Sequence, residues 1–418
     1  MEKYIINGQK KLSGQIRVSG AKNQALKVLP ATLLSDGITK LNNVPEIEDV
    51  HRMIELMTDI GVKVTKLGQG QYEIDPSGLN KTDLSEKLVR QIRSAIMLVG
   101  PLLAKKGKVS MAHPGGCIIG KRPIDLFIYG FEKLGAKYTE NESSYEFSAK
   151  SLKGAEIIIP IISVTVTENL MLAATLATGT TVIKNAACEP EIPTLADYLN
   201  SCGAKISGAG TSTITIEGVK TLKGGEFTII PDRIETGTFV MLGLITQSEI
   251  TITNCEPKHL EIPLFILQKA GAKLEIGPDY IKTFPSKITG NSLATHEYPG
   301  FPTDLQAPYT VLMTQATGTS LIHETIFEGR LLYTDILNQM GANITMCDPH
   351  RVVVSGPTQL FGRKVASPDL RAGITLVLAA LVAQGTTTID NIYQINRGYE
   401  NIVERIKNLG ADIQQIAV

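Results

Sequence analysis

The sequence predicts an α/β protein built from six similar repeats that divide equally between two domains. Three observations predict this fold class: a short phrase that recurs six times, an amphipathic stretch before it, and a β-branched segment farther upstream. The chain has 418 residues, which at roughly 150 residues per domain is enough for two or three domains.

The recurring phrase marks the end of a helix. It reads DIGVK, KLGAK, SCGAK, KAGAK, QMGAN and NLGAD, with glycines at positions 61, 135, 203, 271, 341 and 410, so the intervals are 74, 68, 68, 70 and 69 residues. Before the first phrase, Ile47, Val50, Ile54 and Met57 recur at helical spacing. Gly61 is therefore expected to follow a helix C-terminus. Chance recurrence of a common capping sequence is a poor alternative, because all six copies share the upstream pattern.

Each repeat also carries an apolar segment, a glycine or polar turn and a β-branched strand, as in LAATLATGTTVIKNA. The resulting unit of strand, helix, strand, helix and two strands is too long for a solenoid repeat and too short for a domain. Three such units must pack together to bury their apolar faces. The sequence therefore predicts three repeats in each domain.

Composition excludes several classes of protein. Lys and Arg number 41 and Asp and Glu number 41, so no charge excess supports binding to nucleic acid over a broad face. Five scattered cysteines and six histidines lack the spacing of a disulfide framework or a metal site. The N-terminus lacks the core of a signal peptide, and the apolar run 374–383 is too short to span a bilayer. We expect a cytoplasmic protein with no metal, cofactor or membrane contact.

Polar residues gather where the first helix of each repeat is expected to begin. They are Lys22, Asn23, Arg90, Arg93, Ser163, Thr165, Asp232, Arg233, Glu235, Asp304, Asp369 and Arg371. Helix capping alone would account for the three aspartates. A cation in a first helical turn, however, faces the positive end of the helix dipole. Lys22, Arg93, Arg233 and Arg371 therefore predict a bound anion.

Cys117 lies in the segment HPGGCIIGKRPIDLF, which contains three glycines, and Lys121 and Arg122 follow the cysteine within five residues. A lone cysteine is usually an inert core residue. Here the glycines and Pro114 favour an exposed loop, and the two cations would lower the pKa of the thiol. The sequence therefore predicts a reactive cysteine.

Eight motifs, taken in order, resemble the enolpyruvyl transferase family, and within it the UDP-N-acetylglucosamine 1-carboxyvinyltransferases: SGAKN, PGGCIIGKRPID, ACEPEI, PDRIETGTF, FPTDLQA, IFEGR, DLRAG and INRGYE. The resemblance covers the whole chain and implies a two-domain inverted α/β barrel, with three repeats of βαβαββ around a pseudo-threefold axis in each domain. It implies one domain at 22–230, carrying the PGGC loop, and a second at 1–21 and 231–418. The active site would lie in the cleft between them, with the two connections acting as a hinge.

The resemblance also implies an activity: transfer of the enolpyruvyl group of phosphoenolpyruvate to the 3′-hydroxyl of UDP-N-acetylglucosamine, with release of phosphate. This is the first committed step of peptidoglycan synthesis. Cys117 would be the proton donor and Asp304 the base, so that the implied catalytic set is Cys117, Asp304, Lys22 and Arg397. The implied phosphoenolpyruvate-binding set is Lys22, Asn23, Arg122, Arg371 and Arg397.

A third set of residues would bind the sugar nucleotide. It comprises Asn23, Arg93, Arg122, Pro123, Ile124, Asp125, Leu126, Ile161, Ile162, Ser163, Val164, Asp304 and Ile326. Three residues near these positions depart from the family pattern: Phe127, Thr165 and Glu48. The resemblance further implies that the epoxide fosfomycin alkylates Cys117.

Two other functions remain alternatives. 5-Enolpyruvylshikimate-3-phosphate synthase shares the implied fold and the phosphoenolpyruvate chemistry, but it lacks a reactive cysteine loop. A non-catalytic sugar-nucleotide-binding paralogue would have lost the residues of proton transfer, whereas Cys117, Asp304, Arg371 and Arg397 are all present.

Overall fold

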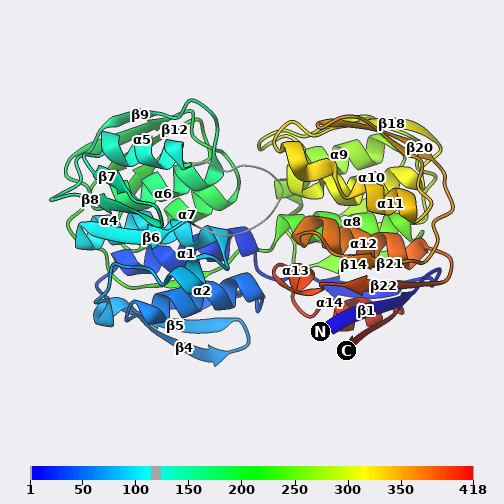
Figure 1. Cartoon of the computed structure of the whole chain (residues 1–418), viewed down its shortest axis with the longest axis horizontal. Coiled ribbons are helices and arrows are strands. Elements are labelled where there is room, and N and C mark those ends of the chain that lie inside the picture. The colour runs from blue at the N-terminus through cyan, green and yellow to red at the C-terminus, as the bar shows by residue number, and fades with distance from the viewer. Residues whose placement is uncertain (1, 114–123, 418) are drawn as a thin grey trace. The chain divides into compact units, whose positions relative to one another are not determined.

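The computed structural model describes residues 2–113 and 124–417, which form two compact units. Unit 1 comprises residues 2–19 and 231–417, and unit 2 comprises residues 20–113 and 124–230. The first boundary lies between Ser19 and Gly20, two residues before the position expected from the sequence, and the second lies between Ile230 and Pro231. Figure 1 shows helices and small sheets alternating along the chain in both units.

Unit 1 contains three four-stranded sheets, in the orders β21-β22-β1-β23, β15-β16-β14-β2 and β17-β18-β20-β19. Its strands are β1 (Glu2–Asn7), β2 (Ser13–Arg17), β14 (Glu249–Thr253), β15 (Lys273–Ile276), β16 (Tyr280–Phe284), β17 (Leu293–Ala294), β18 (Gly318–His323), β19 (Ile344–Asp348), β20 (Arg351–Gly356), β21 (Lys364–Ala366), β22 (Thr386–Asp390) and β23 (Asp412–Ala417). Its helices are α8 (Arg233–Ile245), α9 (Glu261–Lys269), α10 (Gln306–Thr314), α11 (Thr334–Gln339), α12 (Leu370–Val382), α13 (Tyr393–Asn396) and α14 (Ile402–Lys407).

Unit 2 has sheets in the orders β13-β3-β5-β4, β11-β12-β10-β9 and β6-β8-β7. Its strands are β3 (Thr39–Asn42), β4 (Lys63–Gly68), β5 (Gln71–Asp75), β6 (Lys108–Ala112), β7 (Lys137–Glu140), β8 (Ser144–Ser148), β9 (Glu156–Ile158), β10 (Thr180–Lys184), β11 (Lys205–Ser207), β12 (Thr213–Glu217) and β13 (Glu226–Thr228). Its helices are α1 (Lys22–Ala31), α2 (Glu48–Asp59), α3 (Glu86–Val89), α4 (Val99–Lys106), α5 (Asp125–Lys133), α6 (Val164–Ala174) and α7 (Glu191–Ser201). One parallel bridge, Asp83 to Ser110, stands where the third sheet would have a fourth strand.

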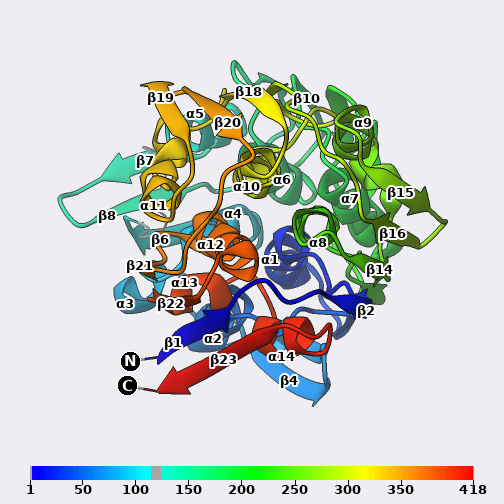
Figure 2. The ribbon, with the colours of Figure 1, turned by 90° about the vertical axis from the view of Figure 1, so that its right-hand side faces the viewer.

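Buried helices fill the centre of each unit. All thirteen residues of α8 are buried, and α10 and α12 pack against it. Figure 2 shows the three sheets of unit 1 placed around these three helices. A helix that is apolar on all sides belongs in a core rather than at a surface. Sheets outside and helices inside are the arrangement expected of an inverted α/β barrel.

The predicted helix ends are confirmed. Each of the six repeat glycines has a positive φ, between 90° and 106°, and follows a helix within three residues. This backbone conformation is open to glycine at little cost, because glycine has no Cβ. The glycine of the recurring phrase therefore recurs because each repeat needs a residue with positive φ after its helix.

Two strands pair far from their sequence neighbours. β2 precedes α1 in the chain but pairs in parallel with β14 of unit 1, whereas β13 precedes α8 but pairs in parallel with β3 of unit 2. The first helices of the two units secure the connecting segments. Gln24, third in α1, accepts the N–H of Ile230 at 2.7 Å, and Glu235, third in α8, accepts the N–H of Ser19 at 2.7 Å.

Candidate functional site

The predicted base of unit 1 lies between two arginines. Asp304 belongs to a short 3₁₀ helix (Thr303–Leu305) that leads into α10. Its Oδ1 accepts a hydrogen bond from Nη2 of Arg330 at 2.6 Å, and its Oδ2 accepts one from Nη2 of Arg371 at 3.0 Å. The two guanidinium groups are almost fully buried, whereas a quarter of the Asp304 side chain is exposed. The carboxylate is therefore held by two cations and open to solvent on one side.

These partners decide the charge of Asp304. Burial alone would raise the pKa of the carboxyl, but the charges of Arg371 and Arg330 and their hydrogen bonds outweigh it and hold the pKa well below its usual range. Burial likewise opposes the charge of Arg371, and Asp304 outweighs it, so the pKa of Arg371 is raised. Asp304 is thus a firmly ionised carboxylate and, in this arrangement, a weak base.

Local structure explains how Arg371 reaches Asp304. Asp369 caps α12, accepting the N–H groups of Arg371 and Ala372 at 2.8 and 3.1 Å. The Nη1 of Arg371 donates to the hydroxyl of Tyr399 at 3.3 Å, and its guanidinium lies 5.9 Å from the centre of that ring. Cap, ring and carboxylate together fix the planar guanidinium in one orientation.

Arg397 directly follows α13 and is largely buried, 8% exposed. Its Nη1 donates to Oε1 of Gln394 at 3.1 Å. Ile326, the remaining predicted residue of unit 1, lies in the turn after β18, where its N–H donates to Oε1 of Glu324 at 2.9 Å.

Unit 2 supplies a second pair of opposite charges. Lys22 is the first residue of α1, and its Nζ lies 2.7 Å from Oδ2 of Asp49 in the first turn of α2. Both side chains are largely buried. Since Lys22 opens α1, its charge faces the positive end of the helix dipole, which Asp49 offsets.

The structure places most of the nucleotide-binding candidates at the starts of helices in unit 2. Asn23 is in the first turn of α1, Arg93 opens the 3₁₀ helix Arg93–Leu98, and Ile124 caps α5, which Asp125 and Leu126 begin. Burial lowers the pKa of Arg93. Ile161 and Ile162 are exposed before α6, Ser163 caps that helix and Val164 begins it. Cys117, Arg122 and Pro123 lie outside the described residues.

Sequence reasoning named three aspartates as possible helix caps. Asp232 and Asp369 do cap α8 and α12. For Asp304 the capping alternative is wrong, because its helix has no side-chain cap and its carboxylate bonds to the two arginines instead. Two partners were missed, Arg330 and Asp49. Arg330 ends the IFEGR motif and could have been noticed there, whereas nothing local in the sequence marks Asp49 as the partner of Lys22.

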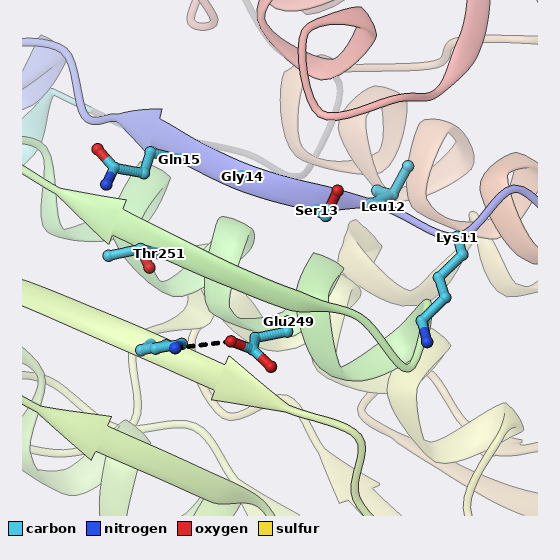
Figure 3. Close-up of a pocket in the computed structure, with 8 residues that line it drawn as sticks. Lys11, Leu12, Ser13, Gly14, Gln15, Glu249 and Thr251 are labelled. Carbon is cyan, nitrogen blue, oxygen red and sulfur yellow. Dashed lines mark ion pairs between the residues drawn. The ribbon is translucent and has the colours of Figure 1, made fainter.

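A separate surface hollow of about 610 Å³ lies along the outer edge of a sheet in unit 1. Figure 3 shows it beside β2, which carries Ser13, Gly14 and Gln15, and β14, which carries Glu249 and Thr251. The Nζ of Lys282 lies 2.6 Å from Oε1 of Glu249. The hollow is lined by residues 11–15 with Glu249, Thr251 and Lys282. None of the predicted site residues in the described part of the chain lines it, so the predicted chemistry lies elsewhere.

Residues 2–113 and 124–417 contain no group of three or more His, Cys, Asp or Glu side chains arranged to hold a metal ion. None of their helices combines the length and the hydropathy that crossing a bilayer requires.

Comparison with known proteins now identifies the family. Residues 6–406 match the family model for EPSP synthase (3-phosphoshikimate 1-carboxyvinyltransferase). Proteins named UDP-N-acetylglucosamine 1-carboxyvinyltransferase from Desulfosudis oleivorans and Desulforapulum autotrophicum are each 44% identical over 417 residues, with 100% of both chains covered.

Solved structures agree in fold. The enolpyruvyl transferase NikO from Streptomyces tendae matches with a TM-score of 0.90 at 23% identity, covering 100% of this chain and 99% of that one. EPSP synthase from Acinetobacter baumannii matches with a TM-score of 0.76 at 20% identity, with both chains covered fully. The predicted fold class is confirmed. The chain belongs to the UDP-N-acetylglucosamine 1-carboxyvinyltransferase family, within the enolpyruvyl transferases.

Proposed function

We propose that the protein transfers the enolpyruvyl group of phosphoenolpyruvate to the 3′-hydroxyl of UDP-N-acetylglucosamine and releases phosphate, a step of peptidoglycan synthesis in the cytoplasm. The observation that carries this proposal is full-length identity of 44% with proteins named for that transfer. The paired carboxylate and guanidinium groups of unit 1 support it, because they suit a small substrate with several negative charges.

The reaction is an addition followed by an elimination. A proton adds to the methylene carbon of phosphoenolpyruvate while the 3′-oxygen bonds to the adjacent carbon, giving a tetrahedral ketal. Loss of a proton from the methyl group and departure of phosphate then restore the double bond. Cys117 is the proposed proton donor, and Lys22, Asn23, Arg122 and Arg397 the proposed phosphoenolpyruvate ligands beside Arg371. Of these, Cys117 and Arg122 lie outside the described residues.

The arginine contacts of Asp304 suggest how it becomes a base. In the free protein, Arg371 and Arg330 keep the pKa of Asp304 well below its usual range. The carboxylate of phosphoenolpyruvate would compete with Asp304 for the fork of Arg371. Losing that cation would raise the pKa of Asp304 and improve it as an acceptor for the proton of the 3′-hydroxyl. Binding of one substrate would thus prepare the base that acts on the other.

Lys22 has a related position in unit 2. Its ammonium is neutralised by Asp49 at 2.7 Å, so the pair is ready to exchange or share partners when phosphate arrives. The proposed sugar-nucleotide ligands of the described residues are Asn23, Arg93, Ile124, Asp125, Leu126, Ile161, Ile162, Ser163 and Val164 of unit 2, with Asp304 and Ile326 of unit 1. Pro123 and Arg122 complete that proposed set.

Acceptor choice tests the proposal. Phosphate release from phosphoenolpyruvate is measured with UDP-N-acetylglucosamine and, separately, with shikimate 3-phosphate. Release with the sugar nucleotide alone is expected. Release with shikimate 3-phosphate instead would favour the synthase alternative, and release with neither acceptor, despite binding of UDP-N-acetylglucosamine, would favour a non-catalytic paralogue.

A further inference from the structure

A buried ion pair joins two helices of unit 2 beside the proposed substrate residues. Lys27 lies one turn after Asn23 in α1, and its Nζ donates to the carbonyl oxygen of Asn23 at 2.7 Å. The same Nζ lies 3.1 Å from Oε2 of Glu168 in α6. The Lys27 side chain is 7% exposed and that of Glu168 is fully buried. One ammonium therefore connects the first turn of α1 to the middle of α6.

The helix that carries Glu168 is itself well anchored. Asn169 accepts the N–H of Gly100 at 2.8 Å and donates to the carbonyl oxygen of Ile96 at 2.7 Å. Thr167 accepts the N–H of Ala187 at 3.1 Å. Because both neighbours of Glu168 are tied to other segments, α6 provides a fixed support, and Lys27 transmits its position to Asn23.

The charge of Glu168 is sensitive to pH near neutrality. Burial raises the pKa of Glu168 to about 7; Lys27 opposes the shift, and Glu191 at the start of α7 and Glu189 just before it add to it. Both carboxylate oxygens of Glu168 are buried and accept no hydrogen bond from the described residues, which also favours the protonated form. Protonation would remove the charge that attracts Lys27.

We propose that Lys27 and Glu168 are positioning residues that hold the Lys22–Asn23 turn of α1 for binding of UDP-N-acetylglucosamine, and that protonation of Glu168 loosens this hold. The proposal rests on the proposed function, because that function makes Asn23 a substrate ligand. In this proposal, neither the Lys27 nor the Glu168 side chain touches substrate. Their effect is on affinity, through the position of the Asn23 turn.

The affinity for UDP-N-acetylglucosamine across a pH range tests whether the Lys27–Glu168 pair affects substrate binding. Titration calorimetry with UDP-N-acetylglucosamine between pH 6 and pH 8 avoids phosphoenolpyruvate, whose phosphate itself titrates near pH 6. For the unmodified protein we expect the dissociation constant to rise by about tenfold towards pH 6, which is the size of one charge-assisted hydrogen bond. In Glu168→Gln the constant should change less than about twofold over that range.

Lys27→Met should bind weakly at every pH, because Glu168 without its cation simply remains protonated. The matched control is Lys184→Met, which removes an exposed ion pair with Glu156 in the same unit and should follow the unmodified protein. A turnover number within about threefold of the unmodified value, at saturating substrate, separates positioning from catalysis. An unchanged pH profile in Glu168→Gln would overturn the proposal.

A second measurement needs no substrate. The free energies of unfolding of Lys27→Met, Glu168→Gln and the double variant form a cycle that isolates the coupling between the two side chains. Coupling should be clear at pH 8 and small at pH 5.5. Absence of coupling at pH 8 contradicts the proposal even if transfer is observed. Coupling with no binding of UDP-N-acetylglucosamine by the unmodified protein instead contradicts the proposed function.

Discussion

Two buried or partly buried carboxylates, one in each unit, have opposite charge behaviour. Asp304 of unit 1 has its pKa held well below the usual range, whereas that of Glu168 in unit 2 is raised to about 7. Burial acts in the same direction on both. The difference comes from their neighbours: Asp304 accepts hydrogen bonds from two guanidinium groups, and Glu168 has one ammonium at 3.1 Å and two acidic neighbours.

The comparison shows that a buried position does not by itself determine a charge. Two planar guanidinium groups satisfy both oxygens of a carboxylate and stabilise its ionised form. The single ammonium beside Glu168 donates its hydrogen bond to a backbone carbonyl, and both oxygens of Glu168 are left without a hydrogen bond from the described residues. Asp304 of unit 1 therefore keeps its charge, whereas Glu168 of unit 2 has a charge that changes with pH.

Removal of a cation from Asp304 should have the largest effect. We expect Arg371→Met to lower the turnover of enolpyruvyl transfer by about a hundredfold or more. The variant lacks the guanidinium and therefore both its proposed substrate contact and its contact with Asp304. Steady-state phosphate release with UDP-N-acetylglucosamine measures this. Arg371→Lys is the matched control for charge without the planar fork and should recover only part of the loss. Normal turnover in Arg371→Met would exclude it from the site.

The pH dependence of the free energy of unfolding should show that Asp304 is ionised in the folded protein. Its lowered pKa contributes stability that is present above the unfolded-state pKa, near 4, and is lost as the pH falls below that value. Asp304→Asn should therefore destabilise the protein by about 2 kcal/mol at pH 7, since it leaves two arginines without their carboxylate. The difference from the unmodified protein should shrink towards pH 3. Chemical unfolding at several pH values checks this, and a difference independent of pH would contradict the assigned charge.

The second arginine tests whether both cations are needed. With Arg330→Met, Asp304 keeps Arg371 but loses its 2.6 Å partner, so its pKa should move back towards the usual value. The higher pKa favours proton acceptance, but the carboxylate also loses the partner that orients its Oδ1, so we expect a net loss of about tenfold in transfer rate. This loss is smaller than for Arg371, whose guanidinium is also a proposed substrate ligand. The acid limb of the pH–rate profile should shift upward. A profile that does not move would mean that Arg371 alone sets the charge.

The sequence predicted the parts of this molecule that depend on local rules. Gly61 and the five equivalent glycines marked helix ends correctly, because a left-handed residue after a helix is most often glycine. Asp232 and Asp369 were recognised as possible caps for the same reason. The recurrence of these local signals was enough to predict six repeats.

Contacts between distant residues could not be predicted in that way. Asp304 is 26 residues from Arg330 and 67 from Arg371, and no periodicity joins them. The pairing of β2 and β13 could not be predicted either. β2 directly precedes α1 of unit 2 but joins a sheet of unit 1, and β13 directly precedes α8 of unit 1 but joins a sheet of unit 2. Glu168 carried no signal in the sequence, since its charge depends on Lys27, Glu189 and Glu191 in two other segments.

The smallest expected effect is that of Glu168 on the free energy of unfolding. Its pH dependence has the opposite sign to that of Asp304. A carboxyl whose pKa is about 7 in the folded protein and about 4.3 when unfolded keeps its proton on folding at intermediate pH. The folded state then binds more protons than the unfolded state, so stability falls as the pH rises from about 4.5 to about 7.

Glu168→Gln removes this titration while keeping the size and polarity of the side chain beside Lys27. The variant should therefore gain stability relative to the unmodified protein as the pH rises from 5 to 8, by on the order of 1 kcal/mol. Unfolding free energies at pH 5, 6, 7 and 8 give the slope directly, with Glu156→Gln as an exposed control in the same unit. Parallel curves for Glu168→Gln and the unmodified protein would mean that Glu168 does not titrate in this range. In that case the two carboxylates would not differ in charge, and the contrast between the units would rest on geometry alone.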